Sequence, residues 1–167
     1  MTSLAADRGR VWQRNLLWLW LGAWIGATTL FGAVTRVVFQ FVTDTTTAGH
    51  LVRALLDPML SIGIVSGVAL SLLAASLRRG RVTIVLPLVL STASLINKFG
   101  VSPAVAEIHL ADPSLAPGLA ARFAALHRLS VWLFVGTGIG TMVLAVAHAL
   151  AEARQARELR PVRIGAS

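Results

Sequence analysis

The sequence contains no cysteine, and only 13% of its residues are charged. The absence of thiols excludes disulfide bonds, thiolate metal sites, thiol catalysis and lipid attachment through cysteine. In an ordinary soluble domain about a quarter of the residues are charged. Hydrophobic residues make up 56% of the 167 residues, and a single domain of this length is too small to bury them in a water-soluble core. We therefore expect lipid to cover the excess apolar surface.

Catalytic and metal-binding motifs are also missing. The sequence has no HExxH motif and no close spacing of histidines with acidic residues. The glycine-rich sequence GTGIGT at 136–141 follows no predicted strand, so it does not predict a phosphate-binding loop. Ser130 lies one turn after His127, a spacing more typical of helix packing than of a catalytic dyad. We expect no catalytic residue and no metal ligand, and the chain is not predicted to be an enzyme.

The four histidines and the net charge of +8 raise the question of haem and of nucleic acid. A haem with two histidine ligands needs both rings at equal depth on facing helices. His127 and His148 fall at opposite ends of one predicted helix, so only His50 with His127, or His109 with His127, meets this condition. The basic residues are dispersed among the ends of apolar segments, which argues against a nucleic-acid surface. We expect no cofactor and no nucleic-acid partner.

Four long apolar runs predict an all-α integral membrane four-helix bundle. The clearest run is 130–150, in which His148 is the only ionisable residue, and about 20 apolar residues of helix cross the hydrocarbon core of a bilayer. The predicted helices cover 15–41, 59–77 with a surface lead-in at 48–57, 82–97 and 123–150. The remaining segments are an N-terminal tail at 1–14, an outer loop at 98–121 and a basic C-terminal tail at 151–167.

Local signals mark the ends of these helices. Asp44 is predicted to be the N-cap of the lead-in segment. Pro58 either kinks one continuous helix or begins a new one, and the sequence leaves both alternatives open. Asn97 and Lys98 are predicted to end the third helix, with a short helix around 104–110 in the outer loop.

The distribution of basic residues predicts which ends face the cytoplasm. Four spans place both tails and the turn around residue 80 on one side. That side has ten basic residues: Arg8, Arg10, Arg14, Arg78, Arg79, Arg81, Arg154, Arg157, Arg160 and Arg163. The other side has five: Arg36, Arg53, Lys98, Arg122 and Arg128. Because cytoplasmic segments carry the excess of Lys and Arg, we expect both termini in the cytoplasm and the protein in the inner (plasma) membrane.

Small residues at i, i+4 spacing predict where helices pack closely, since they let two backbones approach. Three pairs occur, one in each of three predicted helices: Gly22 and Gly26, Gly63 and Gly67, Gly136 and Gly140. Trp12 and Trp18 are predicted to anchor the first helix at the headgroup boundary, which tryptophan favours.

Polar residues are expected to gather at the outer end of the bundle, and they form the strongest candidate site. Ionisable groups at membrane depth are costly and by default suggest a function. This predicted outer cluster consists of Arg36, Asp57, Asn97, Lys98, Glu107, His127 and Ser130. Two interpretations remain: the cluster ties helix ends together by hydrogen bonds, or it binds a small solute or an ion.

Three segments carry a resemblance to a known family. They are RVVFQFVTDTTTAGHLVRALLDPMLSIG, LINKFGVSPAVAEI and RFAALHRLSVWLF. They resemble the transmembrane protein 205-like family, a four-span domain of unknown function, over roughly residues 15–150. The matching positions are Phe39, Ala48 and Gly49; Asn97 and Pro103; and Leu126, His127 and Ser130. The resemblance implies a small helical bundle and implies no reaction.

Two classes of function remain on these observations. The first is a non-enzymatic accessory subunit that packs against other spans, or against itself, in a larger inner-membrane complex, for example an energy-transducing one. The glycine pairs, the tryptophan-rich first helix and the absence of catalytic motifs favour it. The second is a small oligomeric carrier or channel that affects metal or small-solute tolerance, which the predicted outer cluster favours.

Overall fold

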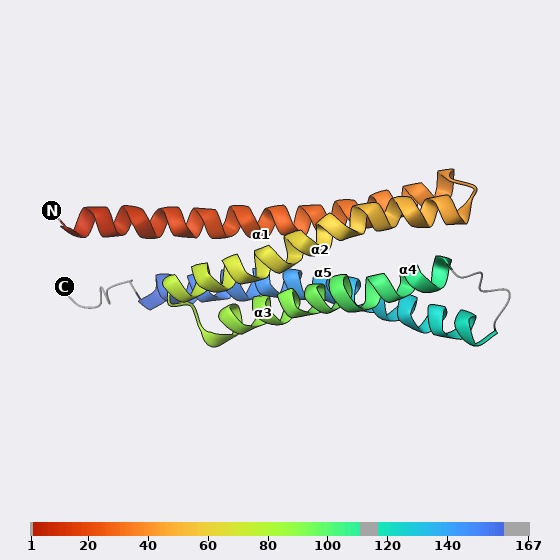
Figure 1. The fold of residues 1–167 in the computed structure, drawn as a ribbon. Coiled ribbons are helices and arrows are strands. Elements are labelled where there is room, and N and C mark those ends of the chain that lie inside the picture. Colours follow the sequence, from red (N-terminus) through yellow and green to blue (C-terminus); the bar gives the residue numbers. More distant parts are fainter. Residues whose placement is uncertain (1, 111–116, 159–167) are drawn as a thin grey trace, which may run out of the picture.

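The structure, a computed structural model, describes residues 2–110 and 117–158 of the chain. Every element in these residues is a helix, and the long helices lie side by side along one axis (Figure 1). The start of α1, the α2–α3 turn and the end of α5 lie toward one end of the bundle, here named the terminal end. The α1–α2 connection lies at the opposite end. The elements are α1 (Thr2–Phe41), α2 (Thr45–Ser76), α3 (Arg81–Ile96), the π-helix η1 (Asn97–Val101), α4 (Ser102–Leu110) and α5 (Pro117–Glu158).

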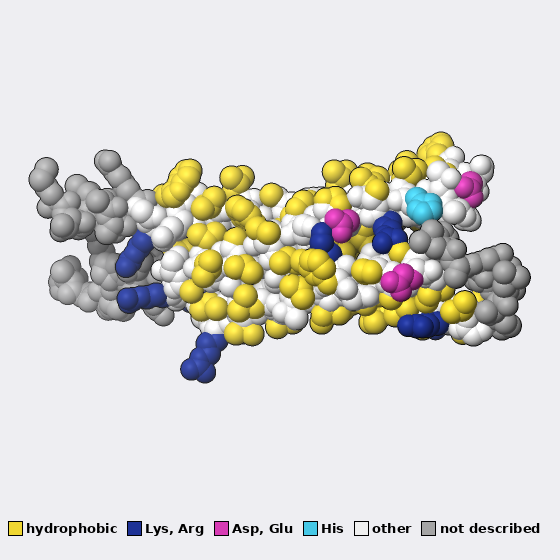
Figure 2. All heavy atoms as spheres, viewed as in Figure 1, with side chains coloured by type: hydrophobic (Ala, Val, Ile, Leu, Met, Phe, Trp, Pro, Cys, Tyr) yellow, Lys and Arg dark blue, Asp and Glu magenta, His cyan; other side chains and the backbone are white. Residues whose placement is uncertain are grey.

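The predicted all-α fold with four long apolar helices is confirmed. Four helical segments are long and apolar enough to cross a membrane: Gly9–Phe41, Thr45–Ser76, Arg81–Ile108 and Gly118–Arg157. Hydrophobic side chains cover much of the visible face between the two ends (Figure 2). Large side chains point outward from the bundle, among them Leu72, which is 66% exposed. The surface between the ends is therefore apolar, as the composition predicts.

Three helices are longer than the sequence pattern suggested. Helix α1 begins at Thr2 rather than near Asn15, because residues 2–14 contain no proline and are rich in helix-forming residues. Helix α2 is continuous through Pro58, which resolves the two alternatives, and it includes the predicted lead-in segment. Helix α5 continues to Glu158, so the first part of the predicted C-terminal tail is helical, and 159–167 lie outside the described residues. Hydropathy marks where polar residues begin, and it does not mark where a helix ends.

The third α-helix ends at Ile96, one residue before the predicted end at 97, but the chain stays helical beyond it. The chain passes from α3 through the π-turn η1 directly into α4, and the amide of Ser102 donates to the carbonyl oxygen of Asn97. An asparagine side chain interrupts a helix mainly by bonding to its own backbone. Here the Asn97 side chain bonds to α5 instead, so it does not compete with the helix. Helix α4 occupies part of the predicted outer loop, and residues 111–116 of that loop lie outside the described residues.

One glycine pair and a core of leucines with one tryptophan determine how the helices pack. A Cβ added at Gly67 would collide with the carbonyl oxygen of Pro87 and would lie 2.5 Å from Ser91 Cβ. A Cβ at Gly63 would lie 2.6 Å from Ser94 Oγ, so α2 and α3 approach closely along this face. The hydrophobic core joins all four long helices and consists of Leu17, Leu21, Trp24, Leu70, Leu90 and Leu144.

Asp44 caps α2 as predicted. Its carboxylate accepts hydrogen bonds from the amides of Thr46 at 3.1 Å and Thr47 at 3.0 Å. The Thr47 hydroxyl also donates to this carboxylate. The hydroxyl and the two amides stabilise the charged form, so the pKa of Asp44 lies below its ordinary value. The cap fixes the start of α2 at the end of the bundle opposite the termini.

Candidate functional site

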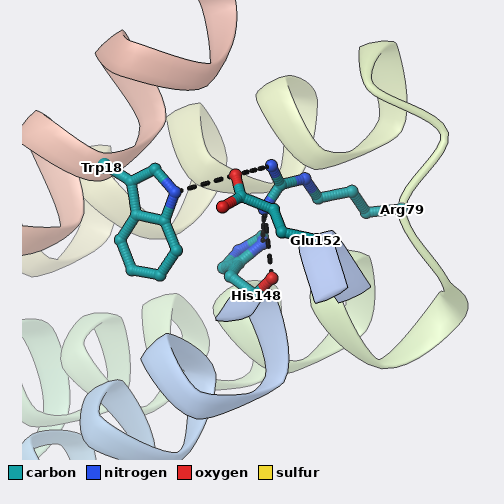
Figure 3. A network of polar contacts seen from close by, with 4 residues as sticks. All are labelled: Trp18, Arg79, His148 and Glu152. Carbon is teal, nitrogen blue, oxygen red and sulfur yellow. Dashed lines mark hydrogen bonds and ion pairs between the residues drawn. The ribbon is translucent and has the colours of Figure 1, made fainter. Parts of the chain in front are cut away.

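A polar network lies at the terminal end, where α1, the α2–α3 turn and α5 meet (Figure 3). It consists of Trp18, Arg79, His148 and Glu152 and is here named the arginine network. Arg79 is only 3% exposed, and His148 is fully buried. A buried guanidinium is costly unless it is paired. Glu152 and His148 are the partners of this buried charge, and Trp18 donates to Glu152.

The local fold of the α2–α3 turn places Arg79 in this network. Helix α2 ends in a Schellman motif, in which the amide of Arg79 donates to the carbonyl oxygen of Ala74 and the amide of Arg78 donates to that of Ala75, both at 3.0 Å. Arg78 occupies the left-handed position of this motif with a φ of 52°, where glycine is more common. The motif reverses the chain at once and leaves Arg79 facing α5 (Figure 3).

Arg79 contacts two residues that are one turn apart on α5. Its guanidinium forms an ion pair with the Glu152 carboxylate. Its Nη1 lies 3.3 Å from His148 Nδ1 and 3.4 Å from the His148 carbonyl oxygen. Because arginine only donates, Nδ1 must accept, and His148 is therefore the neutral tautomer with its proton on Nε2.

Helix α1 enters the network through Trp18. The Trp18 Nε1 donates to Glu152 Oε1 at 2.8 Å, and its ring meets the His148 ring edge-on with 6.4 Å between the centroids. Glu152 thus accepts from the α2–α3 turn and from α1 at the same time. Arg79 Nε and His148 Nε2 are buried without a hydrogen-bond partner in the described part of the chain. The network therefore connects α1, the α2–α3 turn and α5, and its two charged groups, Arg79 and Glu152, are paired with each other.

Farther from the terminal end, the structure joins two small groups from the predicted outer cluster. Ser130 Oγ donates to Asn97 Oδ1 at 2.8 Å, and Asn97 Nδ2 donates to the Ser130 carbonyl oxygen at 3.2 Å. Separately, Lys98 Nζ lies 3.0 Å from Asp57 Oδ2 and donates to Ser61 Oγ at 2.6 Å. The first group links η1 to α5, and the second links η1 to α2. Ser61 was not among the predicted members.

The other three predicted members lie outside these groups. Arg36, Glu107 and His127 are exposed, and the His127 ring stacks on Phe123 of the same helix with 5.9 Å between centroids. The predicted outer cluster is therefore one buried connection, between Asn97 and Ser130, and one partly exposed connection, between Lys98 and Asp57, with exposed residues around them. Residues at one depth of a bundle can face outward or inward, and hydropathy alone did not separate these cases.

The predicted glycine pairs have different environments. Gly63 and Gly67 are buried between α2 and α3, and a Cβ at Gly140 would collide with the Leu90 side chain of α3. By contrast, Gly22, Gly26 and Gly136 have nothing within 4 Å of an added Cβ. The Gly22 and Gly26 pair is thus exposed on the outside of α1.

The arginine network was not predicted, because its signals in the sequence are weak. Trp18 was predicted to be an interface anchor like Trp12, which is 68% exposed, but Trp18 packs against the core and bonds to Glu152. Arg79 was counted only as one of three basic residues in a turn. The spacing of His148 and Glu152, one turn apart at the end of an apolar helix, was the available signal.

The positions of the His, Asp and Glu side chains in the described residues bear on metal and haem binding. No three His, Asp or Glu side chains among residues 2–110 and 117–158 gather closely enough to hold a metal ion. His50 and His127, one of the two pairs considered for haem, are both exposed. A space of about 10 Å³ lies inside the bundle beside Thr28, Ser94, Asn97 and Thr137, which is room for about one water molecule.

Comparisons with protein-family models, with curated proteins and with solved structures find no match to this chain.

Proposed function

We propose that the protein is a multi-pass protein of the inner (plasma) membrane that acts without catalysis, as an accessory subunit packing against another transmembrane helix. Four apolar helices of sufficient length support the membrane assignment. The excess of arginine at the terminal end supports an orientation with both termini in the cytoplasm. Polar contacts join neighbouring helices at the terminal end and again beside Asn97, which suits a rigid structural subunit.

The observation that carries the proposal is the exposed pair Gly22 and Gly26 on α1. In a bilayer, helix association relies on close backbone approach, and small residues at i, i+4 spacing permit it. Within the described chain, the equivalent pair Gly63 and Gly67 is used for this purpose between α2 and α3. Gly22 and Gly26 have open space around them, so the same surface is available to a helix of another protein or of a second copy.

The carrier or channel alternative has less support. A carrier needs an interior that accommodates a solute, and the space beside Asn97 holds about one water molecule. The Asn97 and Ser130 side chains are bonded to each other, and Lys98 is paired with Asp57. These groups therefore have partners that they would have to leave to bind an ion.

The resemblance to the transmembrane protein 205-like family also remains a proposal. Its support from the geometry is a contact between two of the matching positions: Asn97 of the Asn-then-Pro segment bonds to Ser130 of the Leu-His-x-x-Ser segment. Two segments that carry the resemblance thus meet in space. If other members of the family need the same contact, it would explain why both motifs occur.

The test is purification in a mild detergent followed by mass spectrometry of the co-purifying proteins. We expect a stoichiometric membrane partner, or a homo-oligomer, with the wild-type protein. The double variant Gly22→Ile and Gly26→Ile should lose the partner while keeping the wild-type melting temperature. Gly136→Ile is the matched control, since Gly136 is also exposed with open space around it, and it should keep the partner. A wild-type protein that is monomeric and alone in mild detergent would contradict the proposal.

A further inference from the structure

An apolar groove of about 280 Å³ lies between α1 and α5, outside the sites described above. Ile25 and Thr28 line it from α1, and Gly138, Ile139 and Met142 line it from α5. Ile139 is 60% exposed and Met142 is 48% exposed, so the groove opens to the outside of the bundle. Its character is more apolar than the threonine suggests, because the Thr28 hydroxyl donates to the Trp24 carbonyl oxygen at 2.8 Å.

Helical periodicity places arginines on the groove side of both helices at the terminal end. Arg14 precedes Ile25 by 11 residues, about three turns, and Arg157 follows Ile139 by 18 residues, which is five turns. Each arginine therefore shares a face with a residue that lines the groove. Arg14 is exposed and lies one turn before Trp18, whose Nε1 donates to Glu152 of α5, so Arg14 lies close to the α1–α5 boundary.

The distance from Arg14 to the groove matches half of the thickness of a bilayer. At 1.5 Å per residue, Ile25 lies about 16 Å along α1 from Arg14. Half of the hydrocarbon core is about 15 Å, and the headgroup layer adds about 5–7 Å. If Arg14 lies at headgroup depth, the groove lies about one acyl-chain length deeper, near the bilayer midplane.

We propose that the α1–α5 groove binds one anionic phospholipid, with an acyl chain in the groove and the phosphate on Arg14 and Arg157. This rests on the membrane insertion and cytoplasmic orientation given under the proposed function, and it does not depend on the partner at Gly22 and Gly26. The apolar lining fits an acyl chain, and the arginines fit a negative headgroup. One turn of a helix that is about 10 Å wide and 5.4 Å long occupies roughly 400 Å³, which exceeds the groove of about 280 Å³, so the groove suits an acyl chain better than a helix.

The experiment is native mass spectrometry of the purified full chain with palmitoyl-oleoyl phosphatidylglycerol or palmitoyl-oleoyl phosphatidylcholine. We expect one tightly bound phosphatidylglycerol and weaker binding of phosphatidylcholine. Arg14→Gln should lower the phosphatidylglycerol affinity about fivefold. Arg81→Gln is the control, because Arg81 is exposed at the terminal end but lies on α3, which does not line the groove, and it should leave the affinity nearly unchanged.

A second pair of variants tests the groove itself. Ile139→Trp should fill the groove and abolish retention of the lipid, whereas Val143→Trp, at a 52% exposed position outside the groove lining, should not. Equal affinity for the two lipids, or full retention by Ile139→Trp with a wild-type melting temperature, would overturn the proposal. Both readouts use the isolated chain, so they stand whether or not a protein partner co-purifies. Photo-crosslinking from position 139 to a protein segment instead of lipid would also overturn it.

Discussion

Asn97 and Ser130 hold each other by two hydrogen bonds, one from each side chain, across the boundary between η1 and α5. Asn97 is fully buried, so its amide would be unsatisfied without this partner. The same contact keeps Asn97 from capping its own helix, which lets the chain continue into α4. One pair of side chains therefore sets both the packing of α5 and the length of the third membrane-length segment.

Removing this pair should destabilise the bundle. Ser130→Ala leaves the Asn97 Oδ1 without its donor, and we expect a loss of about 1–2 kcal/mol in the free energy of unfolding. Asn97→Ala should cost at least as much, and the double variant should cost less than the sum, because the two residues share one interaction. SDS-induced unfolding in mixed micelles measures all three values. Strictly additive losses would mean that the two hydrogen bonds contribute nothing together.

The glycines of α2 and α1 should respond in opposite ways to alanine. Gly67→Ala forces a Cβ against the Pro87 carbonyl, which is backbone and cannot move aside, and we expect a loss of about 1–3 kcal/mol. Gly26→Ala meets open space and gains helix propensity, so its stability should be unchanged or higher by up to about 1 kcal/mol. Melting curves of the two variants in one detergent make the comparison. Equal tolerance of both substitutions would contradict the close approach of α2 and α3.

Arg79 should differ sharply from its neighbours in the same turn. Arg79→Gln leaves Glu152 without its cation and should destabilise the protein by about 3 kcal/mol, the lower end for a broken buried pair because Glu152 is partly exposed. Arg81→Gln, at an exposed position two residues later, should change stability by less than about 0.5 kcal/mol. Thermal unfolding of both variants gives the answer, and matching losses would mean that the ion pair contributes no stability.

Residue pattern predicted the number of long helices, the N-cap at Asp44 and the Gly63 and Gly67 contact, because each depends on features local to one segment. It did not predict where polar residues point. Arg36 and Asn97 were expected in one cluster, yet Arg36 is exposed and Asn97 is buried, since orientation depends on how neighbouring helices are rotated. The arginine network was missed for the same reason. It joins Trp18, Arg79 and Glu152 across 134 residues of sequence, and its members share no local motif.

The cap of α2 should weaken in acid. The pKa of Asp44 is lowered in the folded protein, so the carboxylate stabilises the fold above its unfolded pKa of about 4, and this contribution is lost as the pH falls through the folded value. Hydrogen exchange at the amides of Thr46 and Thr47 should therefore accelerate below about pH 4, beyond the intrinsic trend of exchange. Asp44→Asn keeps an acceptor without a charge, and it should not show this transition. The same acid dependence in that variant would exclude Asp44 as the cause.

The account depends most on four helices crossing a bilayer with the terminal end inside the cell, and labelling of single cysteines tests this directly. The natural chain has no cysteine, so each introduced thiol is the only target. Thr43→Cys lies between α1 and α2, and Gly80→Cys lies in the α2–α3 turn at the terminal end. A membrane-impermeant maleimide should label Thr43→Cys and not Gly80→Cys in intact cells, and both after the membrane is permeabilised. Labelling of Gly80→Cys in intact cells, or recovery of the protein from the aqueous fraction, would contradict the account.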